Sequence, residues 1–130
     1  MQLEGTEAGS DSGYQATDRL LERQVTFTGI FAFNDHSAIG AVARLKERGL
    51  QIPRDVSVVG FDDIPSARTN NPSLTTVRQP LRSMGETAAN ALLAYIEPQT
   101  RKEMPSTLIV KPDFVVRNST AAVSIERGRA

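Results

Sequence analysis

Residues 28–63 read TGIFAFNDHSAIGAVARLKERGLQIPRDVSVVGFDD, and this stretch decides the fold. Its first six residues form a continuous apolar run, which is typical of a parallel strand covered on both faces. Asn34 and Asp35 then supply a cap and a negative charge for a helix that we expect to end near Arg48. The β-branched run over residues 55–61 predicts a second strand. The order strand, helix, strand predicts a right-handed crossover and therefore an α/β fold with a parallel sheet.

The segments on either side extend this alternation. Upstream, Asp11 or Ser12 can cap a helix that we expect to end near Gln24. Downstream, the proline and asparagine residues of 64–73 indicate a loop, and residues 74–77 a short strand.

The C-terminal part combines one long helix with extended segments. Pro80 suits the first position of a helix over residues 80–97. Residues 106–110 and 113–116 are predicted to be extended, and residues 118–130 to form a flexible tail. The long helix carries an apolar stripe at helical spacing. Members of the stripe are Met84, Ala88, Leu92 and Tyr95.

Composition limits the classes of function. The chain has 130 residues, 39% of them hydrophobic, which suits one ordinary globular domain. Its 15 basic residues balance 15 acidic ones, so no net positive charge draws this segment to DNA. The lack of cysteine excludes a disulfide, a thiolate metal site and a cysteine nucleophile. Neither a signal peptide nor a membrane-length apolar run is present, so we expect a cytoplasmic protein without a membrane partner.

Three motifs carry a family resemblance. FNDHSAIGAVARLKERGLQIPRDVSVVGFDD, NPSLTTVRQP and LIVKPDFVVRNST follow one another in this order. Together they resemble the C-terminal sensor region of LacI/GalR-family transcription regulators, over residues from about 13 to 120. A single GFD would carry little weight, whereas this ordered set is specific.

The resemblance implies an incomplete periplasmic-binding-protein-like type I fold, with a three-layer parallel-sheet subdomain. Residues 1–117 would form part of a LacI-type effector-binding domain, and residues 118–130 the tail. In the family, the helix matching residues 80–97 belongs to the first subdomain, and DNA is bound through a helix-turn-helix head. Neither that head nor most of the first subdomain has a counterpart in these residues. An unpartnered helix of this kind would expose its apolar stripe.

The resemblance also implies an effector site. Asn34, Asp62 and Gln79 match family positions that contact a small-molecule effector, most often a sugar. An amide both donates and accepts hydrogen bonds, and a carboxylate accepts two hydroxyl protons, so these groups suit a sugar. The alternative for Asn34 is a helix cap alone, and for Asp62 a solvated turn residue. We expect Asp63 to face solvent or to cap.

A homodimer is the second implied partner. In the family, the helix matching residues 36–48 and the loop matching residues 68–71 contribute to dimerisation. The candidate interface residues are Ile39, Val42, Ala43 and Asn70. The alternative is that the apolar members of this set all face the sheet.

Two other functions remain open. A sugar-binding component of a transporter would share the fold and similar contacts. A Mg²⁺-dependent phosphotransfer or hydrolase domain would use Asp62 and Asp63 at a strand end. We expect no enzyme, cofactor or resident metal, because the single histidine, His36, lies outside any nucleophile motif and no phosphate loop is present.

Overall fold

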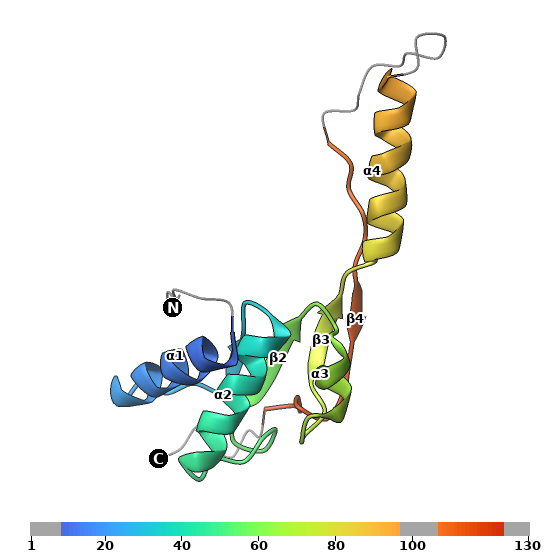
Figure 1. Cartoon of the computed structure of the whole chain (residues 1–130). Coiled ribbons are helices and arrows are strands. Elements are labelled where there is room, and N and C mark those ends of the chain that lie inside the picture. The colour runs from blue at the N-terminus through green and yellow to red at the C-terminus, as the bar shows by residue number, and fades with distance from the viewer. Residues whose placement is uncertain (1–8, 97–106, 124–130) are drawn as a thin grey trace. The chain divides into compact units, whose positions relative to one another are not determined.

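The computed structural model describes residues 9–96 and 107–123. The chain divides into two compact units (Figure 1). The first comprises Met1–Arg78 and Phe114–Ala130, and the second comprises Gln79–Asp113. Each unit is described by itself.

A parallel sheet organises the first unit. Its helices and strands alternate along the chain. They are α1 (Ser10–Glu22), β1 (Gly29–Phe31), α2 (Asp35–Glu47), β2 (Ser57–Phe61), α3 (Pro65–Thr69) and β3 (Thr75–Arg78). The strand order is β1-β2-β3-β4, where β4 is Asp113–Val115. Because β1 pairs with β2, and β2 with β3, in parallel, the carboxyl ends of these three strands meet at one edge. The predicted α/β fold with a parallel sheet is confirmed.

Local signals set the limits of α2. The Oδ1 atom of Asn34 accepts a hydrogen bond of 2.8 Å from the backbone N–H of Ser37, so the predicted cap is present. At the other end Gly49 has a φ of 80°, a left-handed conformation that glycine adopts without a steric penalty. The helix expected to end near Arg48 ends at Glu47.

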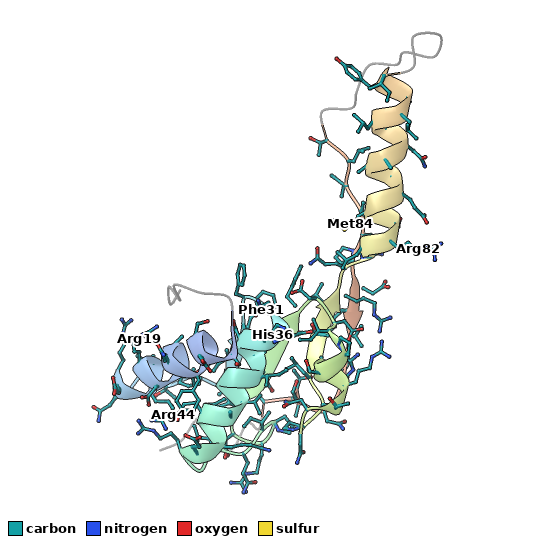
Figure 2. All side chains as sticks on the ribbon, viewed as in Figure 1. Arg19, Phe31, His36, Arg44, Arg82 and Met84 are labelled. Atoms are coloured by element: carbon teal, nitrogen blue, oxygen red, sulfur yellow. The ribbon has the colours of Figure 1, made fainter. Side chains whose placement is uncertain are left out.

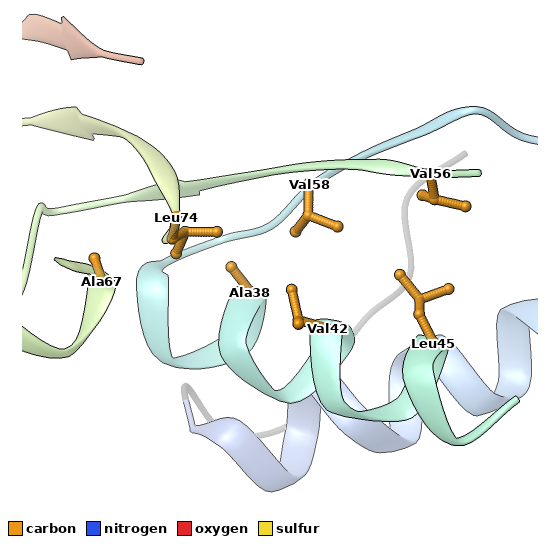
Figure 3. Packing of buried hydrophobic residues seen from close by; sticks show 7 residues of the cluster. All are labelled: Ala38, Val42, Leu45, Val56, Val58, Ala67 and Leu74. Atoms are coloured by element: carbon orange, nitrogen blue, oxygen red, sulfur yellow. The ribbon is translucent and has the colours of Figure 1, made fainter. Parts of the chain in front are cut away.

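One hydrophobic core lies between α2 and β2 (Figure 3). Side chains from one face of α2 point toward the strand, and Ala67 and Leu74 close one end of the cluster. The buried members are Ala38, Val42, Leu45, Val56, Val58, Ala67 and Leu74. Burial of such side chains stabilises a fold by roughly 1.5–3 kcal/mol each.

Two glycines allow α1 and α2 to approach closely. A Cβ atom on Gly13 would lie 2.0 Å from the carbonyl oxygen of Ser37, and one on Gly40 would lie 1.9 Å from that of Ser10. A larger residue at either position would therefore collide with backbone atoms rather than with a side chain that could move.

Ion pairs reinforce the contact of these two helices. Arg44 of α2, labelled in Figure 2, pairs with Asp18 of α1, and its guanidinium lies 5.0 Å from the centre of the Tyr14 ring. Arg48 also pairs with Asp18, at 2.6 Å. Hydrogen bonds from the two arginines hold the pKa of Asp18 below its usual range.

Residues 64–73 differ from the predicted loop. They contain α3, with Pro65 at its start and a hydrogen bond of 2.9 Å from the N–H of Asn70 to the carbonyl of Ser66. Ala67 is fully buried in the core. Proline is a common loop signal, but at a first helical position such as that of Pro65 its missing N–H costs no hydrogen bond.

Strand β1 is covered on one face only within the described part of the first unit. Phe31, labelled in Figure 2, is 67% exposed, and Phe33 is 80% exposed. Ile30, directly before Phe31, and Ala32, between the two phenylalanines, instead pack against the core. The prediction that this strand is covered on both faces is therefore wrong for the residues that the structure describes.

The segment after β4 does not begin a flexible tail at residue 118. Ser119 is fully buried, and its hydroxyl donates to the carbonyl of Val58 at 2.6 Å and accepts from the N–H of Thr75 at 2.8 Å. The N–H of Val58 in turn donates to the carbonyl of Ser119. Residues 118–123 are thus part of the folded unit, and residues 124–130 of the predicted tail lie outside the described residues.

The second unit contains α4 (Leu81–Ile96), which confirms a helix in the predicted position. No residue of α4 is buried, and all four residues of the predicted stripe are exposed within this unit. Of the predicted strand over residues 106–110, residue 106 lies outside the described residues and the rest is not a regular strand. No helix in the described ranges has the length and apolar character needed to span a membrane.

Candidate functional site

Two of the predicted effector contacts stand at the carboxyl ends of neighbouring strands. Asn34 follows β1 and caps α2, and Asp62 directly follows β2. The strands are joined there by the hydrogen bond from the N–H of Ala32 to the carbonyl of Val59, at 2.8 Å. The N–H of Asp62 continues the pairing to β3 by donating to the carbonyl of Val77. The structure therefore brings Asn34 and Asp62 to the same edge of the sheet, where ligands of open α/β sheets bind.

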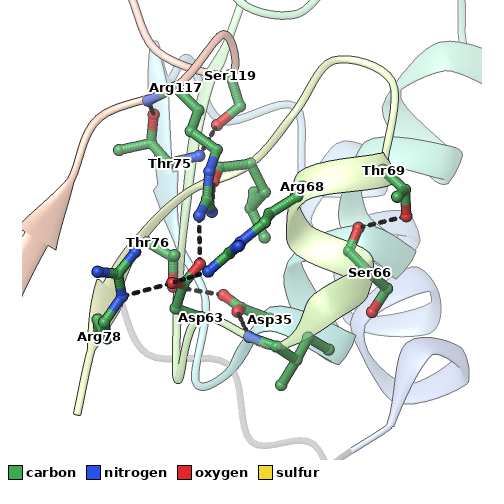
Figure 4. Close-up of polar contacts among 12 residues, drawn as sticks. Asp35, Asp63, Ser66, Arg68, Thr69, Thr75, Thr76, Arg78, Arg117 and Ser119 are labelled. Atoms are coloured by element: carbon green, nitrogen blue, oxygen red, sulfur yellow. Dashed lines mark hydrogen bonds and ion pairs between the residues drawn. The ribbon is translucent and has the colours of Figure 1, made fainter. Parts of the chain in front are cut away.

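The buried carboxylate of Asp35 connects several segments near this edge by hydrogen bonds. Asp35 is fully buried, its Oδ1 atom accepts from the hydroxyl of Thr76 at 2.6 Å, and its Oδ2 atom accepts from the N–H of Ile64 at 2.9 Å (Figure 4). Thr76 belongs to β3, and Ile64 follows Asp62 by two residues. One side chain thus links the segments that follow β1 and β2 to the first half of β3.

Asn34 caps α2 through its side-chain oxygen, and its Nδ2 group can also donate hydrogen bonds to a ligand. Its Oδ1 atom is engaged with Ser37, and its Nδ2 group makes no hydrogen bond with the described residues. An amide has two N–H bonds on nitrogen, so capping and ligand contact are compatible in the same side chain.

The turn after β2 has an unusual backbone. Asp62 has a φ of 110° and Asp63 a φ of 55°, so two consecutive residues other than glycine lie in the left-handed region. Such conformations cost of the order of 1–3 kcal/mol each and persist where the surroundings hold them.

The surroundings of Asp63 are three arginines (Figure 4). Its Oδ1 atom accepts from Arg117, and its Oδ2 atom lies 2.6 Å from Nε of Arg78 and 3.6 Å from Nη2 of Arg68. Burial by itself raises the pKa of Asp63, but the hydrogen bonds and charges of Arg117 and Arg78 outweigh it and hold the pKa below its usual value. The expectation that Asp63 faces solvent or caps is wrong, since its side chain is 2% exposed.

This arrangement disfavours a Mg²⁺ site. The Asp63 carboxylate is already neutralised by guanidinium groups, and a second cation beside them would be repelled. Within the described ranges there is no group of three or more His, Asp or Glu side chains placed to hold a metal ion.

Gln79 is the residue after β3 and the first residue of the second unit. Its carbonyl accepts a hydrogen bond from the N–H of Leu81 at the start of α4. The place of Gln79 in the site stays a prediction.

The four candidate interface residues differ in exposure. Val42 is 2% exposed and packs in the core, so its side chain already has its partners and the alternative that it faces the sheet is the correct one. Ile39 is half-buried against the same core, and Ala43 is exposed. The amide of Asn70 donates to the carbonyl of Pro72 at 3.0 Å. A surface for a partner can therefore include Ala43 and parts of Ile39 and Asn70.

Sequence reasoning missed the residues that support the site. The sequence predicts for Asp35 only a charge at the start of a helix. It predicts for Asp63 only a solvent-facing or capping role, or a place in the Mg²⁺ alternative, and for Arg117 and Ser119 no role in the site. A usable signal was present for Asp63, because one carboxylate of an acidic doublet directly after a buried strand needs a partner if it turns inward. The partners themselves lie too far along the chain for spacing to indicate them.

Comparison with known proteins gives a consistent result. Residues 1–120 match the family model of the periplasmic binding protein-like domain. The HTH-type transcriptional repressor PurR of Erwinia tasmaniensis is 40% identical over 111 residues, which are 85% of this chain and 32% of the repressor. The chain therefore spans about a third of the length of this curated relative.

Solved structures agree with this assignment. The lac repressor dimer bound to operator and the anti-inducer ONPF superposes with a TM-score of 0.80 at 31% identity, over 88% of this chain and 39% of that one. A LacI family transcriptional regulator from Enterococcus faecium with bound ribose has a TM-score of 0.76 at 36% identity, over 92% of this chain and 43% of that one. The chain belongs to the periplasmic binding protein-like domain family, among the sensor domains of LacI-family transcription regulators.

Proposed function

We propose that this chain is the effector-binding part of a LacI-type transcription regulator, and that its effector is a sugar or a similar polyhydroxylated molecule. The observation that carries the proposal is the pair of polar side chains, Asn34 and Asp62, at the carboxyl ends of adjacent parallel strands. The Enterococcus faecium regulator with bound ribose supports the choice of ligand class.

Each side chain has a definite chemical role in this proposal. The Asp62 carboxylate accepts hydrogen bonds from two hydroxyl groups, which orients a sugar ring. The Nδ2 group of Asn34 donates to a ring or hydroxyl oxygen while Oδ1 stays in the cap. The family resemblance adds the amide of Gln79 as a further predicted contact. Such a small set of placed polar groups is typical of ligand sites.

DNA binding and its control belong to the whole regulator. This segment has no net charge, so we assign DNA contact to a helix-turn-helix part of the kind named in the PurR repressor. Effector binding would shift the balance between DNA-competent and DNA-incompetent states in the cytoplasm. A homodimer, as in the lac repressor structure, would use Ala43, Ile39 and Asn70.

Calorimetric titration tests the proposal directly. The chain is titrated with D-ribose, D-glucose and D-galactose, first as wild type and then as Asp62→Asn. Loss of one charge-assisted hydrogen bond should weaken binding by roughly 1.5–3 kcal/mol, which is about ten- to a hundredfold.

Glu22→Gln is the matched control, because it removes a carboxylate from the exposed C-terminal end of α1. It should leave the affinity unchanged. Equal affinity of the Asp62→Asn variant and the wild type for every sugar that binds would exclude Asp62 as a contact.

A transport component is the less favoured function. The relative and the solved regulators compared above are transcription regulators, and no observation on this chain favours transport over regulation.

A further inference from the structure

We infer that Asp63 is a positioning residue, which holds the neighbouring Asp62 in place and links it to both segments through which the chain passes between its two units. The inference rests on the proposed function, because Asp62 is the effector contact that would be positioned. Asp63 together with Arg68, Arg78 and Arg117 is called the Asp63 cluster below.

The contacts of Asp63 with its three arginines differ in strength. Arg117 donates to Oδ1 of Asp63 through Nη2, and Arg78 donates to Oδ2 through Nε at 2.6 Å. The Arg117 side chain is 13% exposed and that of Arg78 is 44% exposed, so solvent screens the Arg117 pair less. Arg68 is 64% exposed and 3.6 Å away, which makes it the weakest member.

Arg78 and Arg117 lie close to the two points where the chain passes between its units. Arg78 is the last residue of β3 and of the first stretch of the first unit, and Gln79 opens the second unit. Arg117 follows β4 by two residues, after the chain has returned from the second unit at Phe114. The outgoing and the returning segment are thus bonded to the same carboxylate.

Two further hydrogen bonds hold Arg117 in place. Its Nη1 atom donates to the carbonyl of Leu74 at 2.8 Å, and its backbone N–H donates to Oγ1 of Thr75 at 2.9 Å. Thr75 is the first residue of β3, and Leu74 directly precedes it. Movement of the returning segment would therefore be transmitted to the carboxylate rather than absorbed by a flexible side chain.

The Asp63 cluster is connected to Asp62 through the backbone turn that the two residues share. Asp62 and Asp63 are consecutive residues with left-handed backbones, a conformation that needs to be held from outside. The N–H of Asp62 is bonded to Val77, directly before Arg78, and the side chain of Asp63 is bonded to Arg78 itself. Without the Asp63 carboxylate, the turn loses the side-chain contacts that fix the direction of the Asp62 side chain.

The test is backbone-amide hydrogen exchange on the full chain, combined with titration by D-ribose. The variants are Asp63→Asn, which keeps the shape and removes the charge, and Arg78→Gln, at a position exposed enough to tolerate the change. The control is Arg82→Gln, which breaks an exposed ion pair with Glu86 on α4.

The Asp62 and Arg117 amides should exchange about tenfold faster in Asp63→Asn, and less so in Arg78→Gln, whereas the Leu45 amide of α2 should not change. Affinity for D-ribose should fall about tenfold in parallel. Arg82→Gln should alter neither property. If Asp63→Asn does not fold, Arg78→Gln carries the test alone.

Uniformly faster exchange across the first unit would overturn the inference, because it would mean a purely structural role. So would unchanged exchange at Asp62 and Arg117, or faster exchange with undiminished ribose affinity. If the wild-type chain binds no sugar while exchange rises only at Asp62 and Arg117, the proposed function fails and the link from Asp63 to both segments stands.

Discussion

Asp35 offers the sharpest test of how the site edge is built, because two substitutions there should differ in a predictable way. The carboxylate is fully buried and accepts hydrogen bonds from Thr76 and Ile64. Alanine would leave both donors buried without an acceptor, at about 1–3 kcal/mol each, and would leave a void. We expect Asp35→Ala to lower the free energy of unfolding by about 3–5 kcal/mol.

Asparagine retains most of the geometry. Its oxygen can still accept from Ile64, and its NH₂ group can donate to the hydroxyl of Thr76 once that hydroxyl turns its proton away. What is lost is the negative charge, with its stronger hydrogen bonds and its favourable position in the first turn of α2. We expect Asp35→Asn to cost about 1–2 kcal/mol.

Urea denaturation followed by far-ultraviolet circular dichroism measures both values, provided that the slope with denaturant is unchanged. Asp113→Asn, at an exposed position of β4, is the control and should change stability by less than about 0.5 kcal/mol. Equal costs for asparagine and alanine would refute the hydrogen-bond account, and so would a cost below about 1 kcal/mol for alanine.

Further outcomes follow from packing and charge. Gly40→Ala should destabilise the chain by about 1–3 kcal/mol or more in the same urea assay, because the added Cβ would collide with the backbone of α1. Gly85→Ala on α4 is the control: its added Cβ would have no atom within 4 Å, so the change should be neutral or stabilising by up to about 1 kcal/mol. Leu45→Ala should cost about 2–5 kcal/mol in thermal unfolding, since Leu45 is fully buried in the core. The lowered pKa of Asp63 means that the unfolded chain takes up the proton first as the pH falls below about 4, so stability contributed by Asp63 is present above that pH and is lost below it. Unfolding midpoints measured from pH 5 to pH 3 should therefore fall more steeply for the wild type than for Asp63→Asn, and parallel curves would contradict the assignment.

Local patterns in the sequence were sufficient for the elements around residues 28–63. The cap at Asn34 and the strand before Asp62 are properties of a few adjacent residues, and the sequence predicts both. The fold class followed from the order of these elements, since consecutive parallel strands require a crossover. The short helix α3 was missed because proline favours both loops and helix starts.

Tertiary structure alone decided which side chains support the site. Ser119 bonds to a residue 61 positions away, Arg117 to Asp63 across 54 positions, and Thr76 to Asp35 across 41. Whether a carboxylate lies buried with partners or faces water depends on which distant segments pack around it, and no local period or motif encodes that. The strands, the crossover helix and the polar residues at the strand ends can therefore be predicted from local sequence. How those polar residues are held depends on the packing of distant segments.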